Sequence, residues 1–132
     1  MNSFNKDQHQ DILERTFRFA VRITRLCVFL DSRGGTGRVL SSQIVRAGTS
    51  VGSQVEEAQA AESTADFVSK MSIGLKEARE THYRLRVLGA TNLVGPSRFG
   101  PLIQEAEELK RIVGAIIVRT KANIRSNRPR RR

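Results

Sequence analysis

The sequence predicts an all-α protein that folds as an antiparallel, up-and-down four-helix bundle, and three observations favour this class. Apolar residues recur every three or four positions along most of the 132 residues, which is the period of an amphipathic helix. Glycine and proline cluster in SRGGTGR at 32–38 and in NLVGPSRFGP at 92–101, stretches that are typical of turns. No segment shows the pattern of a strand, and long helices joined by short connections pack antiparallel.

The first two helices are expected over residues 6–30 and 36–61. The apolar positions of the first are Ile12, Phe19, Ile23, Cys27 and Leu30. Those of the second are Ile44, Gly48, Val51, Val55 and Ala58. Because side chains three and four residues apart lie on the same side of a helix, each set forms one face that can pack in a core.

The third and fourth helices carry recognisable end signals. Ser63 can cap the third helix with Asp66 in its first turn, and this helix is expected to end near Asn92. The fourth begins at Ser97, or with Pro101 at its first helical position, and runs to residue 124. Its acids come early and its bases late, which suits the helix dipole. The apolar faces are Phe67, Met71, Leu75, Ala78, His82, Leu85 and Leu88 in the third helix, and Leu102, Ala106, Leu109, Val113, Ile116, Thr120 and Ile124 in the fourth.

The chain is therefore expected to form one bundle domain, residues 1–124, followed by a basic flexible tail, residues 125–132. Proline and a run of arginines in RSNRPRRR oppose helix formation there. A single cysteine excludes an internal disulfide and fits a reducing cytoplasm. No apolar run reaches the roughly 20 residues that span a bilayer, so we expect no membrane association.

The charge balance predicts a polyanionic partner. The formal net charge is +10, arginine is far commoner than lysine, and five arginines in the tail supply half of the excess. A basic protein of this kind is a natural ligand of RNA or DNA. Solubility alone is the plainer interpretation of the same charge.

Arginines also recur along one side of the first expected helix, where four of them fall within a sector of roughly 80°. We predict that this stripe, the bases at the end of the fourth helix and the tail contact phosphates. The residues are Arg15, Arg18, Arg22, Arg25, Arg119, Lys121, Arg125, Arg128, Arg130, Arg131 and Arg132. Such contacts are electrostatic and tolerant of base sequence, because few aromatic residues are available to stack bases. An ordinary solvated helix face would show the same spacing.

The segment GTSVG, residues 48–52, matches the nucleophile elbow of serine esterases. An elbow requires a strand before the serine, whereas the helical period here continues through the segment. His82 and Asp66 follow Ser50 in the order that a triad needs, but His82 lies on the apolar face expected for the third helix. We therefore interpret His82 as a packed or interface histidine and predict that the protein is not an enzyme.

Metal and cofactor motifs are also incomplete. A di-metal bundle needs Glu-x-x-His pairs, but the residues three positions before His9 and His82 are Lys6 and Arg79. GGTG, residues 34–37, lacks the Lys-Ser/Thr end of a phosphate loop and fits a turn between helices. We expect neither a metal nor a cofactor.

The glycines of GTSVG have a structural explanation instead. Two glycines inside a helix cost roughly 2 kcal/mol against alanine, a loss that close packing with another helix offsets. A stripe of small and polar residues adjoins them, consisting of Gln43, Ala47, Ser50, Gln54, Glu57 and Ala61. Such a stripe is either buried in a hydrogen-bond network or lies at a subunit seam. If Glu57 is buried, it needs a partner, for which Lys70, Lys76, Arg79 or a neighbouring subunit's Arg46 are candidates.

Two segments, LSSQIVRAGTSVGSQVEEA at 40–58 and DFVSKMSIGLKEARETHYRL at 66–85, carry a family pattern. The matching residues are Leu40, Gln43, Arg46, Ala47, Ser50, Glu57, Ala58, Phe67, Lys70, Glu77, Glu80 and Leu85. The chain resembles the bacterial four helix bundle protein family, related to proteins encoded in intervening sequences of large-subunit ribosomal RNA genes and to the accessory variability determinant of diversity-generating retroelements. The chain departs from the pattern at Gln54, where asparagine is usual, at Gly74, where alanine is usual, and at Arg84, where tryptophan is usual.

This resemblance implies a non-enzymatic bundle that assembles as a homopentamer. It also implies, through the retroelement relatives, binding to nucleic acid and to a reverse transcriptase. Our leading hypothesis is an oligomeric accessory protein that binds RNA or DNA. The alternative is a scaffold that binds a protein partner and has no direct role with nucleic acid. We expect the glycine and polar stripe, including Gly48, Ser50 and Gly52, to serve packing or assembly.

Overall fold

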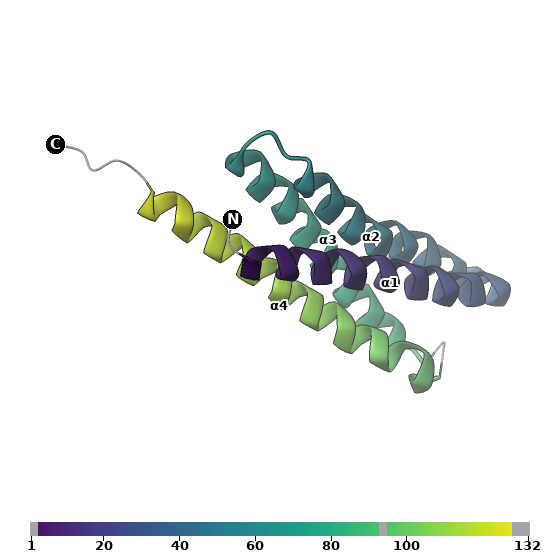
Figure 1. Cartoon of the computed structure of the whole chain (residues 1–132). Coiled ribbons are helices and arrows are strands. Elements are labelled where there is room, and N and C mark those ends of the chain that lie inside the picture. Colours follow the sequence, from purple (N-terminus) through teal and green to yellow (C-terminus); the bar gives the residue numbers. More distant parts are fainter. Residues whose placement is uncertain (1–2, 93–94, 128–132) are drawn as a thin grey trace.

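The computed structural model describes residues 3–92 and 95–127, with side chains described at 11–92, at 95 and at 99–127. Four long helices account for nearly all of these residues (Figure 1). They are α1 (Ser3–Arg33), α2 (Gly35–Gln59), α3 (Thr64–Ala90) and α4 (Pro96–Ser126). The described part of the chain contains no strand, so the predicted all-α class is confirmed.

Helices that follow one another in the sequence pack against one another. α1 packs on α2, α2 on α3 and α3 on α4, while α4 makes a smaller contact with α1. The short connections reverse the chain direction each time, and this confirms the antiparallel up-and-down arrangement (Figure 1). α1 and α3 are therefore diagonal to each other in the bundle.

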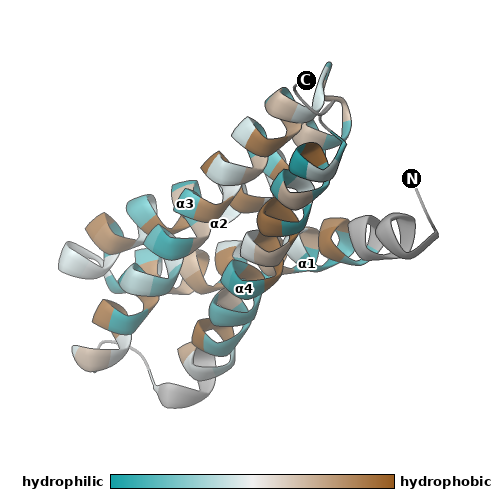
Figure 2. Ribbon diagram, turned by 90° about the vertical axis from the view of Figure 1, so that its left-hand side faces the viewer, coloured by the Kyte–Doolittle hydropathy of each residue, from teal (hydrophilic) through white to brown (hydrophobic). Residues whose placement is uncertain are grey.

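Each helix contributes one apolar side to a common core, and bands of apolar and polar residues alternate along every helix (Figure 2). The largest fully buried side chains are Ile12, Phe19, Ile23, Leu30, Ile44, Val51, Val55, Met71, Leu85, Leu88, Leu109 and Val113. All twelve belong to the apolar faces that the helical spacing predicts. Removing this apolar surface from water is the main force that holds the four helices together.

The helix ends follow local chemistry. Gly34 and Gly35 adopt φ of 70° and 55° and reverse the chain between α1 and α2, a region that glycine enters without steric cost. The Asp66 amide donates to Ser63 Oγ at 3.0 Å, so the predicted cap of α3 is confirmed.

α4 begins at Pro96, next to the predicted Ser97, and the alternative start at Pro101 is wrong because Pro101 lies inside the helix. Pro96 already supplies the fixed φ that suits a first helical position.

The predicted close approach at Gly48 and Gly52 is confirmed, and the neighbour is α1 of the same chain. A Cβ atom built on Gly48 would lie 2.8 Å from Cγ2 of Ile23, closer than real Cβ contacts. A Cβ atom on Gly52 would lie 3.2 Å from Cβ of Thr16. The two glycines thus let the α1 and α2 backbones come together where larger residues would separate them.

Candidate nucleic-acid interface

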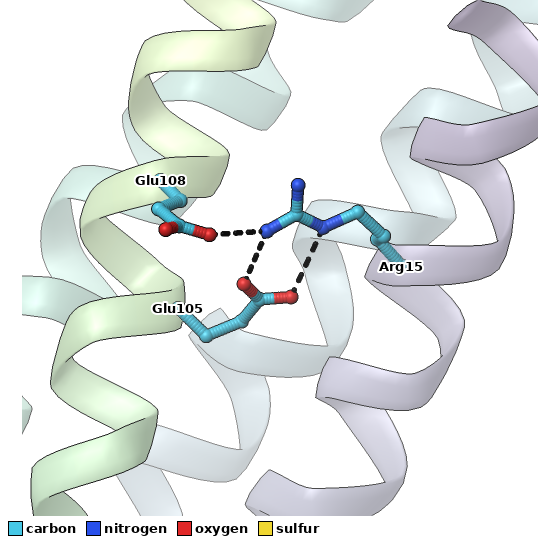
Figure 3. Close-up of polar contacts among 3 residues, drawn as sticks. All are labelled: Arg15, Glu105 and Glu108. Carbon is cyan, nitrogen blue, oxygen red and sulfur yellow. Dashed lines mark hydrogen bonds and ion pairs between the residues drawn. The ribbon is translucent and has the colours of Figure 1, made fainter.

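Arg15 is the one member of the predicted α1 stripe that points into a network of acids. Its guanidinium donates to both carboxylate oxygens of Glu105, with Nε 3.3 Å from Oε2, and to Glu108 Oε2 at 2.6 Å (Figure 3). The hydrogen bond to Glu105 raises the pKa of Arg15, against the opposing effect of its burial. Arg15 therefore joins α1 to α4, and a phosphate would have to compete with two carboxylates for it.

Arg18, Arg22 and Arg25 remain exposed along the outer side of α1, and we call them the α1 arginine stripe. Arg18 pairs with Glu14 at 2.9 Å, but both side chains are largely exposed, and pairs of this kind contribute little. Arg22 and Arg25 make no hydrogen bond or ion pair within residues 11–92 and 95–127. These two guanidinium groups are available to a phosphate.

The predicted basic residues of α4 do not form one surface. Arg119 lines a groove of about 690 Å³ formed by the end of α2, the start of α3 and the C-terminal turns of α4. Lys121 is exposed and follows Arg119 by two residues, so it lies roughly 200° away from Arg119 around the helix. Arg125 is exposed and shares the side of Lys121. Arg128, Arg130, Arg131 and Arg132 lie outside the described residues.

Residues of the family pattern meet along the outer seam between α2 and α3. Arg84 Nη1 donates to Gln43 Oε1 at 2.7 Å, so the arginine that replaces the usual tryptophan joins the two helices. Gly74 lies against Gln54, because a Cβ atom built on Gly74 would lie 3.5 Å from Cβ of Gln54. Arg84 Nε is buried without a hydrogen-bond partner in the described chain, and so is Oε2 of Glu77, which helical spacing places on the same side of α3 as Gly74 and Arg84. Buried polar atoms of this kind are usually satisfied by ordered water or by a neighbouring molecule.

The remaining pattern residues are satisfied locally or exposed. Ser50 Oγ donates to the Arg46 carbonyl at 2.6 Å, one helical turn back. Lys70 pairs with Asp66 at 2.7 Å, within α3. Glu57 and Arg46 are exposed, so Glu57 does not need the buried partner considered for it. Glu80 is half-buried on α3.

His82 lies in the contact between α3 and α4, as a packed histidine. Its Nε2 is 3.4 Å from Glu107 Oε2, and Glu107 also forms ion pairs with Lys110 and Arg111. Burial lowers the pKa of His82, as do the charges of Lys110 and Arg86, and the charge of Glu107 opposes them. No His, Asp or Glu contact with the Ser50 hydroxyl is present in the described residues, so the geometry of a catalytic triad is not formed.

The sequence analysis missed a basic surface on α3. Lys76, Arg79, Tyr83 and Arg86 are all exposed and recur at spacings of three, four and three, which places them on one side of the helix. This spacing was the signal that could have revealed them. These charged residues alternate along the sequence with core positions such as Ala78 and Leu85, whereas five arginines fall within the last eight residues, 125–132.

Two further classes of site can be assessed from the described residues. In that part of the chain, no three His, Cys, Asp or Glu side chains gather as a metal ion would require. None of the described helices combines the length and the apolar character needed to cross a bilayer.

Comparison with known proteins places the chain in a family. The model of the 23S rRNA-intervening sequence protein family matches residues 8–115, which include most of all four helices. The chain belongs to this family. The resemblance found in α2 and α3 is thereby confirmed and extends over α1 and much of α4. A comparison with curated proteins finds no match to this chain.

A solved structure supports the same assignment. A protein of unknown function from the S23 ribosomal protein family of Bacteroides thetaiotaomicron is 34% identical, with a TM-score of 0.76. The match covers 83% of this chain and 97% of that chain. The two proteins therefore share the bundle fold over most of this chain.

Proposed function

We propose that this protein is a non-enzymatic, oligomeric accessory protein that binds nucleic acid through electrostatic contacts. The observation that carries the proposal is the α1 arginine stripe, in which Arg22 and Arg25 are exposed and unpaired in the described part of the chain. The net charge of +10 would attract a polyanion from a distance. The family name, which refers to intervening sequences of 23S ribosomal RNA, is consistent with a role close to RNA.

Assembly would strengthen such weak contacts. The buried, unpaired Glu77 Oε2 and Arg84 Nε on the α2–α3 seam favour this seam as the place where another subunit supplies partners. A homopentamer, as the family resemblance implies, would present five arginine stripes and raise the effective concentration of each. A reverse transcriptase in the cytoplasm is the protein partner that the retroelement relatives suggest.

Fluorescence anisotropy with a labelled 20-nucleotide RNA tests the proposal. The double variant Arg22→Ala/Arg25→Ala should bind more weakly than the wild type, with a salt dependence that is less steep by about 0.7 per lost phosphate contact. The matched control Arg38→Ala/Arg111→Ala removes the same charge from exposed positions of α2 and α4. Equal binding by the two double variants, or no binding by the wild type at low salt, would contradict the proposal.

A protein-binding scaffold with no direct nucleic-acid role is the second candidate function. It is favoured by Phe17 and Val28, which are 63% and 66% exposed. Their spacing of eleven residues, three helical turns, places both on one side of α1. Exposed apolar side chains on one helix side can form part of a protein contact. Capture of an acidic protein that survives nuclease treatment and is lost in Phe17→Ser/Val28→Ser would support the scaffold over nucleic-acid binding.

A further inference from the structure

α3 carries a second row of exposed side chains, three cations and one tyrosine, which we call the α3 stripe: Lys76, Arg79, Tyr83 and Arg86. At about 100° per residue these four positions fall within a sector of roughly 80°, and they extend about 15 Å along the helix. All four are exposed, and the side chain in the middle is aromatic. The row is therefore a continuous basic strip with a flat ring inside it.

The cations of the α3 stripe are not paired with an acid in the described part of the chain, although Glu80 lies one helical turn after Lys76. Lys76, Arg79 and Arg86 have no hydrogen bond or ion pair in the part of the chain that the structure describes. The nearest acid of α4 known to contact α3 is Glu107, and it is already engaged by His82, Lys110 and Arg111. A long phosphate backbone would thus meet free cations along the strip.

α4 adds to the positive field on this side of α3. Lys110 and Arg86 both act on His82 and lower its pKa, which places one cation from each helix close to the same imidazole. Glu107 acts on His82 in the opposite direction, and its effect is smaller than that of Lys110. Arg86 of the α3 stripe therefore has a cation of α4, Lys110, as well as the acid Glu107 in its neighbourhood.

Tyr83 distinguishes the α3 stripe from the α1 arginine stripe. The residue is 61% exposed, and it lies four residues after Arg79 and three before Arg86. An aromatic ring among cations can stack on an unpaired base while the cations hold the flanking phosphates. Bases inside a closed duplex are not accessible to such a ring. An acidic protein surface would use the cations but would gain less from a stacking partner.

We propose that the α3 stripe is a binding site for single-stranded nucleic acid, in which Tyr83 stacks on a base and Lys76, Arg79 and Arg86 contact the flanking phosphates. This inference rests on the proposed nucleic-acid function but names a different surface, because α3 is diagonal to α1 in the bundle. It also names the form of the ligand, a single strand rather than a duplex.

Anisotropy titrations of the full chain with a labelled, mixed-sequence 20-nucleotide RNA, and with the same RNA annealed to its complement, test the site. The wild type should bind the single strand more tightly than the duplex. Tyr83→Ala should weaken single-strand binding by about 5- to 150-fold, the range for loss of one stacked base. The slope of log affinity against log salt should not change in this variant, because no phosphate contact is lost.

The companion variants separate stacking from charge. Tyr83→Phe keeps the ring and should bind like the wild type. Arg79→Ala/Arg86→Ala should reduce the salt slope by about 1.4, at about 0.7 per contact. Arg38→Ala is the matched control for charge at an exposed helical position. All variants change exposed side chains, so their helical circular dichroism and thermal midpoints should match those of the wild type.

Three outcomes would overturn the inference. The first is Tyr83→Ala binding the single strand as the wild type does. The second is an equal loss of single-strand and duplex binding in that variant. The third is tighter binding of heparin, a polyanion without bases, than of RNA. If the Arg22→Ala/Arg25→Ala variant alone loses binding, the inference fails while the proposed function stands; if the wild type binds no nucleic acid at low salt, the proposed function itself fails.

Discussion

Gly48→Ala is the sharpest test of how α1 and α2 fit together. The new Cβ atom would lie 2.8 Å from Cγ2, 3.1 Å from Cγ1 and 3.3 Å from Cβ of Ile23. Ile23 is fully buried, and its β-branched side chain has one strongly preferred χ1 rotamer in a helix. Cγ2 therefore cannot rotate away, and the two helix backbones must separate to relieve the contact.

The expected magnitude follows from two opposing effects. Overpacking a core of this kind costs about 1–3 kcal/mol of unfolding free energy. Replacing glycine by alanine inside a helix returns about 1 kcal/mol. Gly114→Ala is the matched control, because a Cβ atom built on Gly114 meets nothing within 4 Å and only the helix-propensity gain applies. Gly48→Ala should thus be about 1–3 kcal/mol less stable than Gly114→Ala.

Urea denaturation followed by circular dichroism at 222 nm measures the difference, at one fixed protein concentration because assembly affects stability. Ile23→Ala lowers stability by itself, but Gly48→Ala should cost less in the Ile23→Ala background than in the wild type, with a coupling energy of about 0.5–3 kcal/mol, because the smaller residue leaves room for the methyl group. If Gly48→Ala stabilises the protein as much as Gly114→Ala does, the close approach of α1 and α2 at Gly48 is incorrect.

Three further predictions concern other parts of the bundle. Arg15→Met should lower the unfolding free energy by about 1 kcal/mol or less in urea denaturation, because its pairs with Glu105 and Glu108 are partly exposed; a loss several times larger would refute this. Burial in the folded state lowers the pKa of His82 below its ordinary value of 6.5. The stability that the neutral imidazole contributes should therefore be fully present above pH 6.5 and be lost as the pH falls below it. This pH dependence should disappear in His82→Gln. Ser50→Arg should shift the mass in light scattering towards the monomer if the α2 polar stripe forms part of a seam, and an unchanged mass would exclude that placement.

The helices were predictable because their signals are local. The spacing of apolar residues, the glycines at 34 and 35 and the Ser63 cap each act within a few residues, and the structure confirms them. The start of α4 was less certain since Pro96 and Pro101 both lie within one glycine-rich stretch, and either proline suits a first helical position. Local rules alone do not choose between two such signals.

The candidate site was harder to predict because its features depend on which helices meet. Spacing placed Arg15 in a cationic stripe, but its partner Glu105 is 90 residues away in the sequence. Spacing also showed that Gly48 and Gly52 need a close neighbour without showing that α1 supplies it. The α3 stripe required knowledge of exposure, since only the packing of α3 shows which of its sides faces water.

The central claim, electrostatic binding of nucleic acid by this bundle, is tested most directly by the salt dependence of RNA binding. The measurement is the affinity of the wild-type protein for a labelled 20-nucleotide single-stranded RNA across a series of salt concentrations. The account predicts a straight, falling plot of log affinity against log salt, which becomes less steep by about 1.4 in Arg22→Ala/Arg25→Ala. Absence of binding at the lowest salt concentration, or an affinity that does not respond to salt, would contradict it.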